Sequence, residues 1–178
     1  LINIRERLQN AGIEDFEYES WAFLDWKLHI DRAEFYMNPN GEVKEELLAE
    51  LESVLKQREQ RVPLQYLMGE CEFMGYDFYV DERVLIPRQD TECLVELAVE
   101  DIRNRKTQNR CESNNTADQK NEQKVKVLDL CTGSGCIGIS VAKLCPDTEV
   151  TLADISEGAL SVAKKNAQNL DAGVTLIK

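Results

Sequence analysis

The chain has 178 residues, of which 43% are hydrophobic and 30% charged, and these proportions exclude extensive disorder and fibrous repeats. No apolar run approaches the roughly 18 residues that a membrane-spanning helix needs, so we expect no membrane association. With 21 basic and 33 acidic residues, the net charge is −12. This charge repels phosphate backbones and argues against nucleic acid as a direct partner. A small molecule or a basic protein fits the charge better.

The cysteine content indicates a reducing compartment. None of the six cysteines forms a C-x-x-C pair and His29 is the only histidine, so the clustered ligands of a zinc site are missing. Leu1 and Ile2 are soon followed by charged residues, which does not fit a signal peptide. We therefore expect free thiols, no metal and a cytoplasmic protein. The cysteines are Cys71, Cys93, Cys111, Cys131, Cys136 and Cys145.

Residues 1–68 are predicted to form a small helical domain. Within residues 42–60, apolar side chains recur three and four positions apart, which is typical of one face of an amphipathic helix. These positions are Val43, Leu47, Leu48, Leu51, Val54 and Leu55. Pro63 is expected to end this helix, because proline lacks the backbone N–H that the next turn needs.

A second helical stretch, residues 16–28, is rich in aromatic side chains. Two interpretations are open for Trp21 and Trp26. Either they pack into the core of a small helical bundle, or they form an exposed docking patch, because tryptophan is rarely buried completely.

Residues 69–88 are predicted to form a β-hairpin linker. Phe73 precedes Gly75, and Phe78 and Val80 follow it, a pattern that indicates two short strands turning at residues 74–75.

The segment after the hairpin leads into another predicted helix. This helix should begin near Asp90 or Thr91, either of which can serve as its N-cap. Leu94, Ala98 and Ile102 are expected to lie on its apolar face. Residues 104–124 contain Ala117 and Cys111 among polar residues, so we expect a flexible insertion without a functional role.

From residue 125 the pattern becomes strand, helix, strand, helix, strand. The predicted segments are residues 125–130, 135–144, 149–154, a helix capped by Ser156, and 174–177. Such alternation predicts a parallel sheet with right-handed crossovers, which is the α/β Rossmann-like class. We expect residues 89–178 to form one domain of this class.

A glycine-rich segment carries the predicted chemistry. Gly133, Gly135 and Gly138 form G-x-G-x-x-G between a strand and a helix, and Asp154 follows Gly133 by 21 residues at the end of the next strand. In this context, glycines let the backbone approach a nucleoside ligand and the later acid bonds to ribose hydroxyls. A glycine turn used only for packing is the alternative.

Asp129 distinguishes two possible ligands of this segment. A dinucleotide places a negative pyrophosphate at the helix N-terminus, whereas S-adenosylmethionine has no phosphate and carries an ammonium and a sulfonium. A carboxylate at the end of the first strand repels the former and attracts the latter by about 4 kcal/mol at roughly 4 Å, before desolvation. The sign of the charge therefore favours S-adenosylmethionine. Cys131 and Cys136 are interpreted as small packing residues, because a nucleophilic thiol needs a nearby base.

Several stretches resemble the release-factor glutamine methyltransferases of the PrmC or HemK type. Residues 61–66 are similar to the family's R-x-P-x-Q-Y, residues 69–80 to its hairpin, and residues 84–92 to "VLIPRPETE", with Gln89 in place of a proline. Residues 127–135 resemble "VLDLGTGSG", with Cys131 replacing the first glycine. We expect that replacement to be tolerated if the position does not need a positive φ.

The resemblance implies an S-adenosylmethionine-dependent enzyme that methylates the side-chain amide of a glutamine in a peptide chain release factor, a step linked to translation termination. It further implies that the helical domain docks the release factor and that the hairpin linker joins it to the methyltransferase domain. The cofactor-binding residues that it implies are Asp129, Cys131, Thr132, Gly133, Ser134, Gly135 and Asp154, with Pro87 and Arg88 near the pocket. For Arg88 an ion pair with Glu92 at i+4 is an equal alternative.

The family's acceptor motif, N-P-P-Y, does not occur in the sequence. We therefore expect a C-terminally truncated chain that is inactive alone, with no catalytic residue among those present. Two other functions stay open. One is a different class I N-methyltransferase acting on protein or nucleic acid, and the other is a non-catalytic module that binds a release factor.

Overall fold

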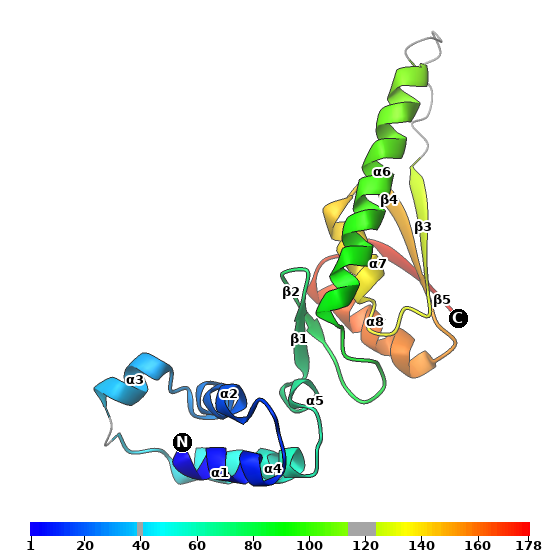
Figure 1. Cartoon of the computed structure of the whole chain (residues 1–178). Coiled ribbons are helices and arrows are strands. Elements are labelled where there is room, and N and C mark those ends of the chain that lie inside the picture. Colours follow the sequence, from blue (N-terminus) through cyan, green and yellow to red (C-terminus); the bar gives the residue numbers. More distant parts are fainter. Residues whose placement is uncertain (39–40, 114–123) are drawn as a thin grey trace. The chain divides into compact units, whose positions relative to one another are not determined.

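The computed structural model describes residues 1–38, 41–113 and 124–178, with the backbone alone over 108–113. The chain divides into two compact units, Leu1–Met68 and Gly69–Lys178 (Figure 1). In the described residues, no helix is long and apolar enough to cross a membrane.

In its described residues, the first unit contains helices and connecting segments but no strand. Its helices are α1 (Ile2–Asn10), α2 (Phe16–Leu28), α3 (Arg32–Met37), α4 (Glu45–Glu59) and α5 (Leu64–Met68). The predicted helices over residues 16–28 and 42–60 are thereby confirmed. Leu51 and Leu55 of α4 are buried as expected, but Leu48 is 45% exposed because the buried face is narrower than the sequence pattern indicates.

Helix α4 ends before Pro63 rather than at it. Gln60 is the C-cap and Arg61 has a left-handed backbone with φ of 69°. Because the residue before a proline is disfavoured in helical conformation, the chain has to leave the helix before Val62. Pro63 instead precedes α5, where its carbonyl accepts hydrogen bonds from the N–H groups of Tyr66 and Leu67.

Both tryptophans pack against the core of the helical unit while staying half-buried. The ring of Trp21 meets that of Phe35 edge-on at 5.2 Å between centroids. The Lys27 ammonium lies 4.0 Å from the centre of the Trp26 ring, a favourable cation–π arrangement. The bundle-core interpretation therefore fits better than an exposed docking patch.

The predicted hairpin is confirmed at the start of the second unit. Strands β1 (Glu70–Phe73) and β2 (Tyr76–Tyr79) pair antiparallel. Met74 and Gly75 between them have φ of 54° and 74°. Two consecutive left-handed residues match the twist of the flanking strands, as in a type I′ turn.

Helix α6 (Glu92–Ser113) differs from the prediction in two ways. Its buried face is formed by Val95, Val99 and Ile102, whereas Leu94 is 53% exposed. Helix α6 follows a short 3₁₀ turn, η1 (Gln89–Thr91).

The second difference is its length. Residues 104–113 continue the helix and are not the start of a loop. Residues 114–123 of the predicted insertion lie outside the described residues.

The polar extension of α6 has a local explanation. Arg105 donates to Asp101 one turn earlier, with 2.7 Å between Nε and Oδ2. Arg, Lys, Gln and Glu have high helix propensity, so a solvent-exposed helix can continue without an apolar stripe. An apolar period arises only where one face of a helix is buried. It therefore does not predict a helix that is exposed on all sides.

The rest of the second unit is a three-stranded parallel sheet in the order β3–β4–β5. Its strands are β3 (Val125–Leu130), β4 (Thr148–Ala153) and β5 (Val174–Ile177), joined by α7 (Cys136–Leu144) and α8 (Glu157–Asn169) (Figure 1). The predicted α/β class is confirmed as a partial Rossmann-like fold.

The two faces of this sheet differ in burial. Val127 and Leu152 belong to the face that packs in the core with α7 and α8. On the opposite face Leu128 and Leu130 are 60% and 70% exposed. The helices thus cover one face of the sheet in the described residues, and the glycine-rich loop emerges at its carboxyl edge.

Candidate functional site

Asp129, Asp154 and the loop of residues 131–135 come together at the carboxyl ends of β3 and β4. Asp129 lies within β3 opposite Leu152 of β4, and Asp154 follows β4 directly. The loop of residues 131–135 connects β3 to α7 between these two acids. Because parallel strands end at one edge, a ligand at this edge meets the loop and both acids together.

Asp154 is hydrogen-bonded to the glycine-rich loop. Its Oδ2 accepts from the Gly133 N–H at 2.9 Å, and its Oδ1 accepts from the Ser156 N–H at 2.9 Å. Ser156 also caps α8, since its hydroxyl accepts from the Ala159 N–H at 3.2 Å, as predicted. The carboxylate therefore fixes the loop against the start of α8.

Asp129 holds the other side of the same loop. Its Oδ2 accepts from the Thr132 hydroxyl at 2.6 Å and from the Gly138 N–H at 3.0 Å. One carboxylate oxygen thus links β3 to the loop and to the first turn of α7, where negative charge also complements the helix dipole.

Among the described residues, the charges of these two acids have no cationic partner. Across the described residues, no Lys, Arg or His forms an ion pair with Asp129 or Asp154. Their partners are neutral N–H and O–H donors, which stabilise carboxylates without cancelling their charge. The site therefore presents two net negative charges beside a glycine-rich loop.

Gly138 is required for close packing. A side chain there would collide with Leu152 and place its Cβ 3.0 Å from Asp129 Oδ2. The missing side chain lets the N–H of Gly138 reach the Asp129 carboxylate. Gly133, in contrast, has φ of 57° and open space where a Cβ would be, so its backbone is accessible to a ligand.

The replacement of glycine by Cys131 was expected to be tolerated only if this position does not need a positive φ, and the structure does not meet that condition. Its φ is 61°, in the left-handed region, and its side chain is exposed. A non-glycine residue pays about 1–2 kcal/mol for this conformation. The position therefore does favour glycine, and the packing interpretation is wrong for Cys131.

Cys136 does fit the packing interpretation. It is buried in the core of the second unit, and burial raises the pKa of its thiol to about 11. A thiol with so high a pKa is protonated at neutral pH and a poor nucleophile.

Pro87 and Arg88 precede η1 on a segment beside the hairpin. The Pro87 carbonyl lies 3.7 Å from the Cys71 sulfur of β1, and Arg88 is exposed. Glu92 Oε1 accepts from the Met74 N–H in the hairpin turn at 2.6 Å, and in the described residues no ion pair joins Glu92 to Arg88. The alternative interpretation of Arg88 is therefore wrong, and its place near a cofactor stays a prediction.

Sequence reasoning missed Asn166. This α8 residue is fully buried and hydrogen-bonded to both β2 and the glycine-rich loop. The available signal was an amide on a helix face otherwise formed by Ala159, Val162 and Ala163, since buried polar groups need specific partners.

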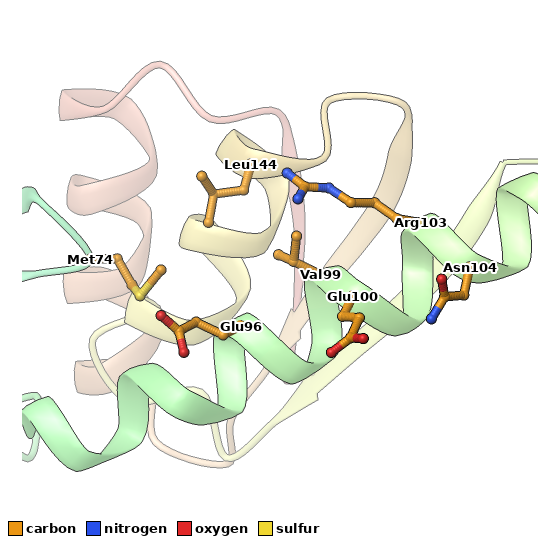
Figure 2. Close-up of a pocket in the computed structure, with 7 residues that line it drawn as sticks. All are labelled: Met74, Glu96, Val99, Glu100, Arg103, Asn104 and Leu144. Atoms are coloured by element: carbon orange, nitrogen blue, oxygen red, sulfur yellow. The ribbon is translucent and has the colours of Figure 1, made fainter.

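An open hollow of about 350 Å3 lies elsewhere in the second unit. Figure 2 shows its lining of apolar, polar and charged side chains, which come from the hairpin turn, α6 and the end of α7. They are Met74, Glu96, Val99, Glu100, Arg103, Asn104 and Leu144. None of them is a predicted site residue, so the hollow is separate from the glycine-rich loop.

Fold and site together define a partial Rossmann-like α/β unit with a glycine-rich loop, preceded by a helical unit. Comparison with known families gives a narrower description. Residues 1–69 match the PrmC N-terminal domain, and residues 115–178 match the methyltransferase small domain.

Curated proteins similar to this chain include release factor glutamine methyltransferases. The chain is 38% identical to that of Clostridium acetobutylicum over 96% of its own length and 54% of the relative's. It is 34% identical to that of Geobacter sulfurreducens over 98% and 55%, and 36% identical to that of Flavobacterium psychrophilum over 93% and 52%. The predicted resemblance is confirmed, and the chain spans about half the length of these relatives.

Similarity to solved structures is weaker. A tRNA (uracil-54, C5)-methyltransferase of Pyrococcus abyssi, in complex with S-adenosyl-L-homocysteine, overlaps 61% of this chain and 22% of its own. The TM-score is 0.43 and the identity 17%, which is too low for an inference about this chain.

Proposed function

We propose that this chain carries the cofactor site of an S-adenosylmethionine-dependent methyltransferase that modifies the side-chain amide nitrogen of a glutamine in a peptide chain release factor. The similarity of nearly the entire chain to about half the length of release factor glutamine methyltransferases supports the reaction. The site itself supports the cofactor.

The observation that carries the proposal is the uncompensated charge of Asp129 and Asp154 beside the glycine-rich loop. Both carboxylates are held by neutral donors, so their field favours a cation over a phosphate. S-adenosylmethionine brings an ammonium and a sulfonium, whereas a dinucleotide brings a pyrophosphate. Water is partly excluded from these half-buried groups, and this strengthens the discrimination.

In the proposed complex, Asp129 faces the methionine ammonium and Asp154 accepts hydrogen bonds from the ribose hydroxyls. Each carboxylate oxygen can accept more than one hydrogen bond, so binding the ligand does not require the loop contacts to break. Cys131, Thr132, Gly133, Ser134 and Gly135 then line the ligand through their backbone. Pro87 and Arg88 are proposed to lie near the same pocket.

The chemistry requires positioning more than acid–base catalysis. When bound, the cofactor supplies an electrophilic methyl group on its sulfonium. The glutamine amide is a poor nucleophile, because its nitrogen lone pair is delocalised into the carbonyl. An enzyme therefore accelerates the transfer most by holding the amide nitrogen in line with the sulfonium methyl group within a preorganised polar site. Residues 129–138 provide the cofactor side of that arrangement.

The remaining assignments follow the resemblance. We propose that residues 1–68 dock the release factor, since residues 1–69 match the PrmC N-terminal domain, that residues 69–88 act as a hairpin linker, and that residues 89–178 form part of the methyltransferase domain. The free thiols of Cys71, Cys93 and the other described cysteines support a cytoplasmic location.

Isothermal titration tests the cofactor assignment. We expect the chain to bind S-adenosylmethionine and the Asp154→Ala variant to bind it at least about tenfold more weakly, because a hydrogen bond to a charged group contributes roughly 1.5–3 kcal/mol. Asp147→Ala is the matched control, since Asp147 is an exposed acid at the opposite end of β4. Equal affinity of the Asp154→Ala variant and the unaltered chain would overturn the assignment.

A chimera tests the reaction. In the Clostridium acetobutylicum relative, the segment that aligns with this chain is replaced by residues 1–178, and methyl transfer to a release factor is measured. We expect transfer by the chimera, and none by the chimera carrying Asp154→Ala or by the 178-residue chain alone. A folded chimera that binds cofactor but methylates only a different protein or a nucleic acid would refute the proposed substrate.

A further inference from the structure

The buried amide of Asn166 joins three segments that are far apart in sequence. Asn166 is 0% exposed. Its Oδ1 accepts from the Tyr79 N–H at 2.7 Å, and its Nδ2 donates to the Tyr79 carbonyl at 2.9 Å and to the Ser134 carbonyl at 2.8 Å. Helix α8, strand β2 and the glycine-rich loop therefore meet at one side chain.

Only one orientation of this amide satisfies its partners. The Tyr79 N–H needs an acceptor, while the two carbonyls of Tyr79 and Ser134 need donors. Rotating the amide by 180° would oppose the Asn166 carbonyl oxygen to other carbonyl oxygens. The position of one partner therefore constrains the other two.

The Tyr79 contact resembles an added strand. The Asn166 amide pairs with both the N–H and the C=O of Tyr79, as a neighbouring peptide group would. The hairpin is consequently attached to α8 by its backbone, in addition to the side-chain packing of Phe73 and Phe78 in the core.

The Ser134 contact acts on the proposed cofactor loop. Ser134 lies between Gly133 and Gly135, whose φ values of 57° and 83° define the turn. Asp129 and Asp154 hold Thr132, Gly133 and Gly138 by hydrogen bonds to this region, and Asn166 holds the Ser134 carbonyl. The loop is thus held by hydrogen bonds to three side chains, those of Asp129, Asp154 and Asn166.

We propose that Asn166 is a positioning residue that couples cofactor binding at the glycine-rich loop to the position of the hairpin. The inference rests on the proposed function of the loop. A ligand that fixes residues 131–135 fixes the Ser134 carbonyl, which orients the Asn166 amide and thereby its bond to the Tyr79 N–H. Because such coupling is reciprocal, a substrate that orders the hairpin also strengthens cofactor binding.

Hydrogen exchange at the Tyr79 amide measures the coupling in the unaltered chain. We expect S-adenosylmethionine to slow this exchange by about tenfold, a typical magnitude for coupled sites. The Gly75 amide is the internal control. It lies in the same hairpin but donates to Glu72 at 3.2 Å, away from Asn166, and its exchange should not change.

Variants at position 166 separate coupling from simple packing. Asn166→Ala leaves two carbonyls and one N–H without partners, so we expect about tenfold weaker cofactor binding and no effect of cofactor on Tyr79 exchange. Asn166→Asp keeps the shape but removes both donors, and it should act in the same direction if Asn166→Ala does not fold. Asn169→Ala, an exposed asparagine of the same helix, should change neither quantity.

The outcomes distinguish the two proposals. If the unaltered chain does not bind S-adenosylmethionine, the proposed function is wrong and the inference fails with it. If the chain binds the cofactor, but Tyr79 exchange is insensitive to it or the variants at position 166 bind as tightly as the unaltered chain, the inference alone is wrong.

Discussion

The helical unit and the glycine-rich loop of the α/β unit use their carboxylates in opposite ways. In the helical unit, Glu52 and Glu59 face the guanidinium of Arg7, and Glu19 faces that of Arg58, so negative charge is neutralised by positive charge. In the α/β unit, Asp129 and Asp154 face backbone N–H groups and a hydroxyl. The first arrangement stabilises a fold, whereas the second stabilises a fold and keeps a net negative charge for a ligand.

The comparison has a physical basis. A guanidinium matches a carboxylate with two parallel hydrogen bonds and a full opposite charge. A neutral donor supplies the hydrogen bond and only a partial charge. The sequence composition, acidic overall, does not reveal which carboxylates are neutralised, and only the contacts show it.

The largest expected effect concerns the ion pair of Arg58 and Glu19. Their side chains are only 13% and 10% exposed, with Nε to Oε2 at 2.7 Å and Nη2 to Oε1 at 2.9 Å. Arg58→Ala leaves a carboxylate buried without its partner and should lower the free energy of unfolding by about 3 kcal/mol. Urea unfolding followed by tryptophan fluorescence measures this, because both tryptophans lie in the helical unit.

Lys56→Ala is the control for that prediction. Lys56 lies on the same helix and pairs with Glu52 at 3.5 Å, with side chains 65% and 45% exposed. Such exposed i, i+4 pairs contribute roughly 0.5 kcal/mol or less. Equal losses in the two variants would show that burial does not set the strength of these ion pairs.

A somewhat smaller effect is expected at Gly138, in the α/β unit. Gly138→Ala forces its Cβ against Leu152 and Asp129, and overpacking of this kind costs about 1–3 kcal/mol. Thermal unfolding followed by circular dichroism measures the loss. Gly173→Ala is the control, since nothing lies within 4 Å of a Cβ there, and a similar loss in that variant would contradict the packing argument.

Cys131→Gly should stabilise the same unit. Glycine removes the strain of the left-handed backbone but adds freedom to the unfolded chain, so the net gain is about 1 kcal/mol or less. Cys131→Ala keeps the strain and should give no gain. A Cys131→Gly variant that is less stable than Cys131→Ala would show that relief of strain at the positive φ does not outweigh the freedom that glycine adds to the unfolded chain.

The smallest expected effect is the pH dependence carried by Arg7. Hydrogen bonds from its guanidinium lower the pKa of Glu52 and of Glu59 below the ordinary value of a glutamate carboxyl. A carboxyl whose pKa is lower in the folded than in the unfolded state stabilises at neutral pH, and this stability is lost as the pH falls through that ordinary value and below. Arg7→Met should therefore reduce the difference in melting temperature between pH 7 and pH 3.5, measured by tryptophan fluorescence. An unchanged difference would contradict the assignment.

Much of the fold could be predicted because its signals are local. The helix over residues 16–28, the hairpin turn at Met74 and Gly75, and the alternation from residue 125 onward follow from apolar spacing and glycine placement. The extension of α6 could not be predicted in this way, since the sequence of residues 104–113 has no apolar period. The exposure of Leu94 likewise depends on which neighbours α6 meets.

The site was predictable in its residues but not in its connections. Asp129 and Asp154 stand out by their position at the ends of two successive predicted strands, and the structure brings both to the glycine-rich loop. The left-handed φ of Cys131 is not visible in its residue type. The role of Asn166 depends on partners 87 and 32 residues away, and no local pattern encodes such contacts.

The most direct test of the central claim is a comparison of two ligands by isothermal titration, S-adenosylmethionine and NAD, against the unaltered chain and Asp129→Asn. The neutral amide keeps the shape of Asp129 and removes its charge. We predict that the unaltered chain binds S-adenosylmethionine and not NAD. The variant should bind S-adenosylmethionine at least about tenfold more weakly. Binding of NAD by the unaltered chain, or the same S-adenosylmethionine affinity with and without the charge at position 129, would contradict it.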